Sequence, residues 1–343
     1  MTAAPVFLDH PASLAHETGA HPERPARMVA ISQELERRGW LGYARRQSPE
    51  VARSDLLAVH PERQIELIER AADRGGAQID ADTVVSPGSF QAAAHAAGGA
   101  VALVDLLLDG AAPTGFSAHR PPGHHAERDR AMGFCLFNSI AVAARHAVAE
   151  RGCERVMIVD WDVHHGNGTN NVFHADPQVL FLSIHQSPLY PGTGPASDVG
   201  SGAGRGFTVN LPVAPGSGDD VFAALVDHVA VPLAREFAPQ LLLISAGFDA
   251  HAEDPLADCQ VTEAGFSTMA RSLADVAAEL EVPVGAVLEG GYALDALGRS
   301  VAATMETLAA PPRAAAPTPA GRSDQARAAR ARLAQWWPGL SGG

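Results

Sequence analysis

The residues from Val156 to Gly168 have types and spacing that could do chemistry: V-M-I-V-D-W-D-V-H-H-G-N-G. The apolar run Val156–Val159 predicts a buried strand, which we expect to be parallel because it is apolar throughout. If the chain stays extended beyond it, Asp160, Asp162 and His164 share one face, since side chains two apart in a strand point the same way. Ligands of open α/β sheets bind beyond the carboxyl ends of strands. The spacing therefore predicts two carboxylates and an imidazole at such an edge.

An aspartate and a histidine on one face suit a divalent transition metal, with zinc as the first choice. A hydrolytic zinc site has three protein ligands and one position open for water, so a third ligand must come from elsewhere. The alternative is that Asp160 and Asp162 cap a helix and that the histidines are ordinary surface residues, since short motifs often mislead.

Three further polar clusters follow the ends of predicted strands. They are His124 with His125, Asp249 with His251, and Tyr292. All of them would lie at one edge of a parallel sheet, together with the cluster from Asp160 to Asn167. This convergence is far more specific than any one motif and indicates an active site.

Strands and helices alternate through most of the chain, which predicts a mostly parallel sheet covered on both faces. Apolar runs predict strands at 6–8, 114–118, 156–159, 179–184, 207–211, 241–245 and 284–288. Helices are predicted at 24–38, 54–74 with a break near Pro61, 91–108, 138–150, 219–237, 262–280 and 294–308. Residues 79–90 are expected to form an irregular loop.

The composition limits the class of protein. The 343 residues suffice for one large α/β domain or two small ones, and 46% of them are apolar. No apolar run looks long enough to span a bilayer and the N-terminus lacks a signal-like segment, so we expect a cytoplasmic protein and no membrane partner. The net charge of −14 argues against nonspecific binding of nucleic acid. Cys135, Cys153 and Cys259 form no C-x-x-C motif and are expected to be buried free thiols.

The C-terminal part differs in composition. Residues 309–320 are rich in proline and alanine and are expected to form a linker, followed by a short helix at 323–337. We therefore divide the chain into a catalytic domain at 1–310 and a linker with a short helix at 311–343. Trp336 and Trp337 could pack on a partner subunit of a homo-oligomer, but packing back on the domain is favoured.

Six motifs, in this order, resemble the histone deacetylase superfamily: R-P-P-G-H-H-A, G-F-C-L-F-N-S, D-W-D-V-H-H-G-N-G, Y-P-G-T-G, S-A-G-F-D-A-H and L-E-G-G-Y. They are most similar to its class II branch and to bacterial histone deacetylase-like amidohydrolases, and the resemblance covers roughly residues 5–308. The resemblance implies the arginase-deacetylase fold, a single α/β domain around a central eight-stranded parallel sheet covered by helices.

The resemblance also implies a ligand set. Zinc would be bound by Asp162, His164 and Asp249, the first aspartate after S-A-G-F, with His251 and Asp254 as competing candidates for the third ligand. These N and O ligands accept Fe²⁺ as well as Zn²⁺. A structural potassium ion is implied near Asp160, Asp162, His164 and Ser183.

Catalytic roles are implied in the same way. His125 resembles the general base that later acts as acid, and His124 its electrostatic partner, held by Asp160. Asn167 stands behind His125, where class I relatives have an aspartate. Tyr292 resembles the tyrosine that donates its O–H to the oxyanion of the transition state.

The substrate channel would be lined by Phe134 and Tyr190, with Gly133 and Pro122 nearby, and facing aromatic walls suit the slender chain of acetyl-lysine. At its rim the resemblance implies Leu256 and an aspartate for the substrate backbone, Asp82 or alternatively Asp80.

The sequence thus predicts a zinc-dependent amidohydrolase that acts on acetylated lysine in peptides or proteins. One alternative is an acetylpolyamine deacetylase acting on an acetylated amine. Another is a catalytically weak acyl-lysine-binding scaffold, against which the complete set of ligands, histidines and tyrosine argues.

Overall fold

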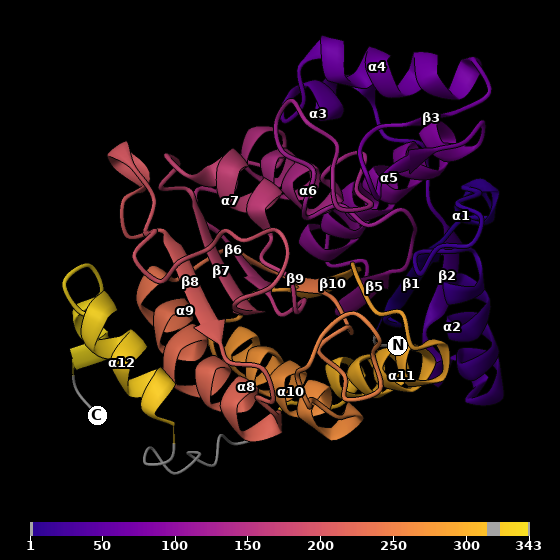
Figure 1. Ribbon diagram of the computed structural model, residues 1–343. Coiled ribbons are helices and arrows are strands. Elements are labelled where there is room, and N and C mark those ends of the chain that lie inside the picture. The colour runs from indigo at the N-terminus through magenta and orange to yellow at the C-terminus, as the bar shows by residue number, and fades with distance from the viewer. Residues whose placement is uncertain (1–2, 314–322, 342–343) are drawn as a thin grey trace.

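The centre of the protein, in this computed structural model, is an eight-stranded sheet whose strands are all parallel (Figure 1). The structure describes residues 3–313 and 323–341. The strand order is β2-β1-β5-β10-β9-β6-β7-β8. The strands are β1 (Val6–Asp9), β2 (Ala44–Gln47), β5 (Thr114–Ser117), β6 (Val156–Asp160), β7 (Val179–Gln186), β8 (Thr208–Val213), β9 (Leu241–Ala246) and β10 (Val284–Leu288). The predicted fold class, a single α/β domain around an eight-stranded parallel sheet, is confirmed.

Helices cover both faces of this sheet, as the alternation of elements predicts (Figure 1). On one face lie α3 (Arg53–Leu57), α4 (Glu62–Asp73), α5 (Ser89–Leu108), α6 (Ser139–Ala149) and α7 (Asn167–Phe173). On the other lie α2 (Ala26–Arg37), α8 (Asp219–Leu225), α9 (Val231–Phe237), α10 (Glu263–Glu279) and α11 (Leu294–Ala309). The short helix α1 (Ala12–Ala15) follows β1.

An apolar core lies between the sheet and each helical layer, and the central strands contribute side chains to both cores. In β6, Met157 and Val159 belong to the core under α10 and α11, whereas Val156 and Ile158 belong to the core under α5 and α6. Successive side chains of a strand point to opposite faces, so a strand buried on both faces must be apolar throughout. This is why β6 has the continuous apolar run from which it was predicted.

Several elements differ from the prediction. The edge strand β2 was missed because A-R-R-Q has no apolar pattern and is largely exposed, as charged edge strands commonly are. The expected loop at 79–90 includes β4 (Val84–Val85), which pairs with β3 (Ala77–Gln78), and the first turn of α5. The predicted helix at 219–237 contains a π-helical turn, Val226–Ala230, just before Pro232, which has no backbone N–H to donate. Helix α7 was not predicted.

The 20-residue helix α5 is by length and hydropathy alone sufficient to cross a bilayer, contrary to our expectation that no segment is. However, 67% of its most apolar window is buried inside the protein, and α5 packs against α6. Core helices of globular domains have the same composition.

The C-terminal helix α12 (Asp324–Leu333) packs against α8 and against the π-helical turn Val226–Ala230. Trp337 is buried against Phe207, with ring centroids 5.3 Å apart, and its Nε1–H donates to the Gly206 carbonyl at 2.8 Å. It therefore packs back on its own chain. The predicted linker falls largely on residues 314–322, outside the described residues, and the division at residue 310 stays a prediction.

Candidate metal centre and active site

Three buried side chains meet beyond the carboxyl ends of β6 and β9. Asp162, His164 and Asp249 each offer a ligand atom, and these atoms lie within 4.8 Å of one another. His164 Nδ1 is 3.2 Å from Asp162 Oδ1 and 3.1 Å from Asp249 Oδ2. Strands β6 and β9 are hydrogen-bonded neighbours in the sheet, so the loops that follow them converge. Within 3–313 and 323–341 this is the one group of three such residues able to hold a metal ion.

The chemistry of this group fits a divalent cation. Two buried carboxylates cost free energy unless a cation accompanies them. Burial alone would lower the pKa of His164, but the hydrogen bonds to Asp162 and Asp249 outweigh it and raise that pKa to about 10. The imidazole proton thus occupies the position of a cation, which a metal would displace on binding.

The backbone next to this group leaves room only for glycine. A Cβ on Gly290 would lie 2.1 Å from Asp249 Oδ2 and 2.6 Å from Asp162 Oδ2, and the Gly290 N–H donates to Asp162 Oδ2 at 2.8 Å. Likewise, a Cβ on Gly247 would lie 2.0 Å from Asp162 Oδ2. The two glycines form a close cradle for the carboxylates.

The competing candidates for the third ligand make other contacts. His251 Nδ1 accepts the Glu253 N–H at 3.0 Å, and its ring stacks on Phe266. The Asp254 carboxylate accepts the backbone N–H groups of Tyr292 at 2.6 Å and Leu256 at 3.0 Å. Of the three candidates, only Asp249 lies with Asp162 and His164 in the group that could hold a metal ion.

Two adjacent histidines, both buried, border the group of Asp162, His164 and Asp249. His124 Nδ1 is 3.0 Å from Asp160 Oδ2, and His125 Nδ1 is 2.7 Å from Asn167 Oδ1. Burial would lower the pKa of His124, but the charges of Asp162 and Asp160 outweigh it and raise that pKa well above its usual value. Burial and the positive charge of His124 lower the pKa of His125 far below its usual value. These opposite shifts favour the charged form of His124 and the neutral form of His125, which can accept a proton.

Tyr292 lies two residues beyond the glycine cradle and is buried. Burial raises the pKa of its hydroxyl well above the usual value, so the O–H stays a donor at neutral pH. The Phe134 ring stands perpendicular to the Tyr292 ring, with centroids 5.7 Å apart, and the Arg27 guanidinium lies 5.0 Å from the Tyr292 ring centroid. These contacts fix the ring from two sides.

The predicted channel residues gather around the same histidine. The Tyr190 ring meets His125 edge-on at 5.2 Å and is 38% exposed, as a residue at a channel entrance would be. Gly133 has a positive φ of 56°, and a Cβ there would lie 2.5 Å from His125 Cδ2, so only glycine fits. Phe134 follows it with its N–H bonded to Thr83 Oγ1 at 3.1 Å. Pro122 is buried two residues before His124.

The predicted rim residues Asp82 and Leu256 are linked to Phe134 and Tyr292 through Thr83 and Asp254, respectively. Thr83 Oγ1 also donates to Asp82 Oδ1 at 3.1 Å, which links the rim aspartate to the Phe134 wall. Burial and the nearby Asp80 raise the pKa of Asp82. Leu256 is partly exposed, and Asp254 connects its backbone to that of Tyr292.

A buried ion network that sequence reasoning missed supports the tyrosine turn. Arg120 Nε and Nη2 donate to the two carboxylate oxygens of Glu23 at 2.6 and 2.7 Å. Arg27 Nη1 donates to Glu23 at 3.2 Å, while its Nε donates to the Gly291 carbonyl at 2.7 Å. The available signal was the i,i+4 spacing of Glu23 and Arg27 at the start of α2.

Glu289 was missed as well, although it belongs to the L-E-G-G-Y motif. Its buried carboxylate accepts the N–H groups of Gly123 at 2.6 Å and His124 at 3.0 Å, and the Ser245 hydroxyl at 3.1 Å. It therefore joins the histidine loop to β9 and β10.

Glu23→Gln is expected to destabilise the fold by about 3–5 kcal/mol, because it leaves two buried arginines without a full counter-charge. Burial would raise the pKa of Glu23, but Arg120 outweighs it and lowers that pKa to about 2, against about 4.3 in an unfolded chain. The depressed pKa means that the carboxylate stabilises the fold above about pH 4.3 and loses this effect as the pH falls toward 2. Urea unfolding as a function of pH tests this, with exposed Glu17→Gln as control. Equal stability of Glu23→Gln and wild type would contradict it.

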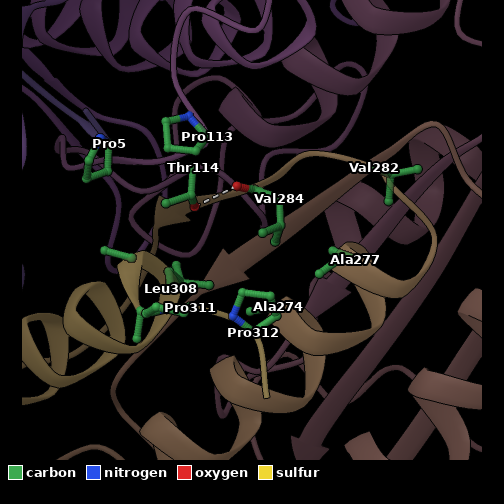
Figure 2. Close-up of a pocket in the computed structure, with 13 residues that line it drawn as sticks. Pro5, Pro113, Thr114, Ala274, Ala277, Val282, Val284, Leu308, Pro311 and Pro312 are labelled. Carbon is green, nitrogen blue, oxygen red and sulfur yellow. Dashed lines mark hydrogen bonds between the residues drawn. The ribbon is translucent and has the colours of Figure 1, made fainter. Parts of the chain in front are cut away.

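A cavity of about 340 Å³ lies away from these residues, at the amino ends of β5 and β10 (Figure 2). Its lining is almost wholly apolar, and the Thr114 hydroxyl there already donates to the Val284 carbonyl at 2.8 Å. With no titratable side chain in its wall, this cavity offers no catalytic chemistry. Its lining is Pro5, Pro113, Thr114, Ala274, Ala277, Ala278, Val282, Val284, Leu308, Ala309, Ala310, Pro311 and Pro312.

Comparisons with known proteins show the family of the chain and its fold. Residues 21–308 match the histone deacetylase domain family. Histone deacetylase 14, chloroplastic, from Arabidopsis thaliana is 40% identical over 319 residues, covering 87% of this chain and 75% of that protein. A probable deacetylase of Archaeoglobus fulgidus is 38% identical, covering 83% and 80%. A histone deacetylase-like amidohydrolase of Pseudomonas aeruginosa is 42% identical over 250 residues, covering 72% and 66%. The crystal structure of the HDA15 HD domain superposes with a TM-score of 0.92 at 36% identity, covering 99% of this chain and 97% of that one.

Proposed function

Because the chain belongs to the histone deacetylase family, we propose that it is a zinc-dependent amidohydrolase that removes acetyl groups from lysine side chains of peptides or proteins. Family membership and the names of the relatives support a deacetylase. The observation that carries the finer proposal is that the histidine pair and a buried tyrosine adjoin the group of Asp162, His164 and Asp249. His124 Nε2 lies 3.7 Å from Asp162 Oδ1, and the ring centroids of His125 and His164 are 5.8 Å apart.

Zinc held by Asp162, His164 and Asp249 would polarise the amide carbonyl and make water more acidic. His125, whose Nδ1–H is donated to Asn167, takes a proton from the attacking water at Nε2 and later gives it to the leaving amine. His124 stays protonated against Asp160, and its charge favours the negative charge that develops beside it.

Tyr292 supplies the remaining donor. Phe134 and Arg27 pack on its ring, and its O–H would stabilise the oxyanion that forms from the substrate carbonyl. A scaffold that only binds acyl-lysine would have no need for this donor or for a neutral histidine beside a charged one.

The aromatic side chains suggest the shape of the substrate. Phe134 lies against Tyr292, and Tyr190 lies against His125, so apolar walls flank the reacting groups. The aliphatic stem of acetyl-lysine suits such walls. Asp82, joined to the Phe134 wall through Thr83, is the proposed acceptor for N–H groups of the substrate backbone.

Leu256 decides between acetyl-lysine peptides and acetylated polyamines. A polyamine has a second ammonium that a partly desolvated carboxylate at the rim would attract, and a leucine offers no such charge. The wild type is therefore expected to prefer an acetyl-lysine peptide over acetylspermidine in kcat/KM. Leu256→Glu should shift the ratio of the two kcat/KM values toward acetylspermidine by about 1–2 kcal/mol, as one partly exposed ion pair would.

Both substrates are measured on wild type, Leu256→Glu and the neutral control Leu256→Gln. A wild type that already prefers acetylspermidine would overturn the lysine assignment and favour the alternative, a polyamine deacetylase.

The identity of the bound ions and the location and partners of the protein are further proposals. The N and O ligands suit Fe²⁺ as well as Zn²⁺. A structural potassium ion is proposed near Asp160 and Ser183, which are register partners in β6 and β7. A cytoplasmic location, the absence of nucleic-acid and membrane partners, and a homo-oligomer stay predictions.

A further inference from the structure

The Asn167 side chain contacts His125 Nδ1, and the orientation of its amide determines which ring nitrogen of His125 carries the proton. Its Oδ1 faces His125 Nδ1 at 2.7 Å, which requires a proton on Nδ1 and leaves Nε2 free to accept one. An asparagine amide can turn by 180° with almost no change of shape. The turned amide would donate to Nδ1, move the ring proton to Nε2 and remove the base. Nothing in His125 itself prevents this.

The other end of the amide meets Glu127. Asn167 Nδ2 donates to Glu127 Oε1 at 2.9 Å, and makes weaker contacts with the His125 carbonyl and Met132 Sδ, both at 3.4 Å. An ionised carboxylate can only accept, so a turned amide would place its Oδ1 against an acceptor. Hydrogen bonds to an ionised partner are also stronger than neutral ones. Glu127 thus selects the orientation that leaves His125 Nε2 free.

Glu127 is well placed to hold this position. It lies two residues after His125, and its own N–H donates to the Arg130 carbonyl at 2.9 Å in a tight turn. The same loop therefore carries the base and, through Asn167 in α7, the group that orients it. An aspartate at position 167 would place a negative charge directly against His125. In this protein Glu127 supplies that charge on the far side of the Asn167 amide.

We propose that Glu127 is a positioning residue for the reaction. Its carboxylate fixes the Asn167 amide, and with it the tautomer of His125, and supplies through Asn167 the negative charge behind that histidine. The inference rests on the proposed function, because it concerns His125 as the base.

The experiment measures kcat and KM of the zinc-loaded full chain on an acetyl-lysine peptide. Glu127→Ala should lower kcat about tenfold or more with little change in KM, as loss of an orienting partner typically does. Glu127→Gln should also lower kcat, because an amide can donate as well as accept and no longer selects one orientation of Asn167.

The same substitution of Glu127, made in the Asn167→Asp variant, separates a positioning role of Glu127 from simple structural support. Asn167→Asp alone places two carboxylates at hydrogen-bond distance and should lower kcat. Adding Glu127→Gln to Asn167→Asp should restore kcat about tenfold or more over Asn167→Asp alone, because the glutamine amide then donates to the new aspartate. The same substitution is thus harmful beside asparagine and beneficial beside aspartate, which loss of packing would not produce.

Asp129→Asn is the matched control. It removes one negative charge from the same turn, but its carboxylate pairs with Arg63 at 2.6 Å on the surface, and kcat should stay at the wild-type value. An inactive wild type would refute the proposed function. An active wild type with unchanged kcat in Glu127→Ala and Glu127→Gln would overturn the positioning role alone. So would a double variant no more active than Asn167→Asp.

Discussion

Asp162→Ala and Asp249→Ala are each expected to lose the bound metal and all measurable turnover together. Each leaves only two protein ligands, and two protein ligands seldom hold zinc. The carboxylates are buried and project from neighbouring strand ends, so no other side chain of the described residues completes the group. Metal content by mass spectrometry and turnover of an acetyl-lysine peptide are measured on the same preparations.

His251→Ala is the control for this experiment, because His251 was a competing ligand and lies two residues from Asp249. Its Nδ1 accepts the Glu253 N–H, so its loss should leave the metal content unchanged. Stoichiometric metal in an active Asp249→Ala variant would show that the third ligand is assigned wrongly.

Tyr292→Phe is expected to lower kcat by about a hundredfold or more, because it removes one oxyanion donor. KM should change little, since the ring keeps its contacts with Phe134 and Arg27. Steady-state kinetics on the acetyl-lysine peptide measure both constants.

Tyr43→Phe is the matched control. It also removes a buried tyrosine hydroxyl, which donates to the Met305 carbonyl at 2.8 Å, but it lies in another part of the fold. It should cost stability and leave kcat unchanged. A Tyr292→Phe enzyme with wild-type kcat and a raised KM would contradict the assigned role.

The strands that bear the site residues could be predicted because both burial in the sheet and ligand binding at its edge constrain their sequences. Strand β6 must be apolar to lie between two cores, and the residues after it must be polar to bind a ligand. Each of the seven predicted strands corresponds to an observed strand. Strand β2 could not be predicted because it is largely exposed, so neither core imposes an apolar pattern on it; β8, at the other edge of the sheet, is buried and was predicted.

The groups that position the site could not be predicted, for a different reason. Glu289 and Asp254 act through backbone N–H groups, and Arg27 acts through backbone carbonyls. Such contacts depend on how loops far apart in the sequence meet, and no local pattern encodes them. Glu127 acts on a side chain 40 residues away in the sequence.

We propose above all that the Asp–His–Asp group binds the metal on which deacetylation depends. The most direct measurement is acetate release from an acetyl-lysine peptide by the full chain as purified, after removal of metal by a chelator, and after addition of one equivalent of Zn²⁺. We expect that release stops on metal removal and returns on addition of zinc, and that neither metal nor activity returns in Asp162→Ala. Undiminished acetate release by the metal-free chain would contradict it.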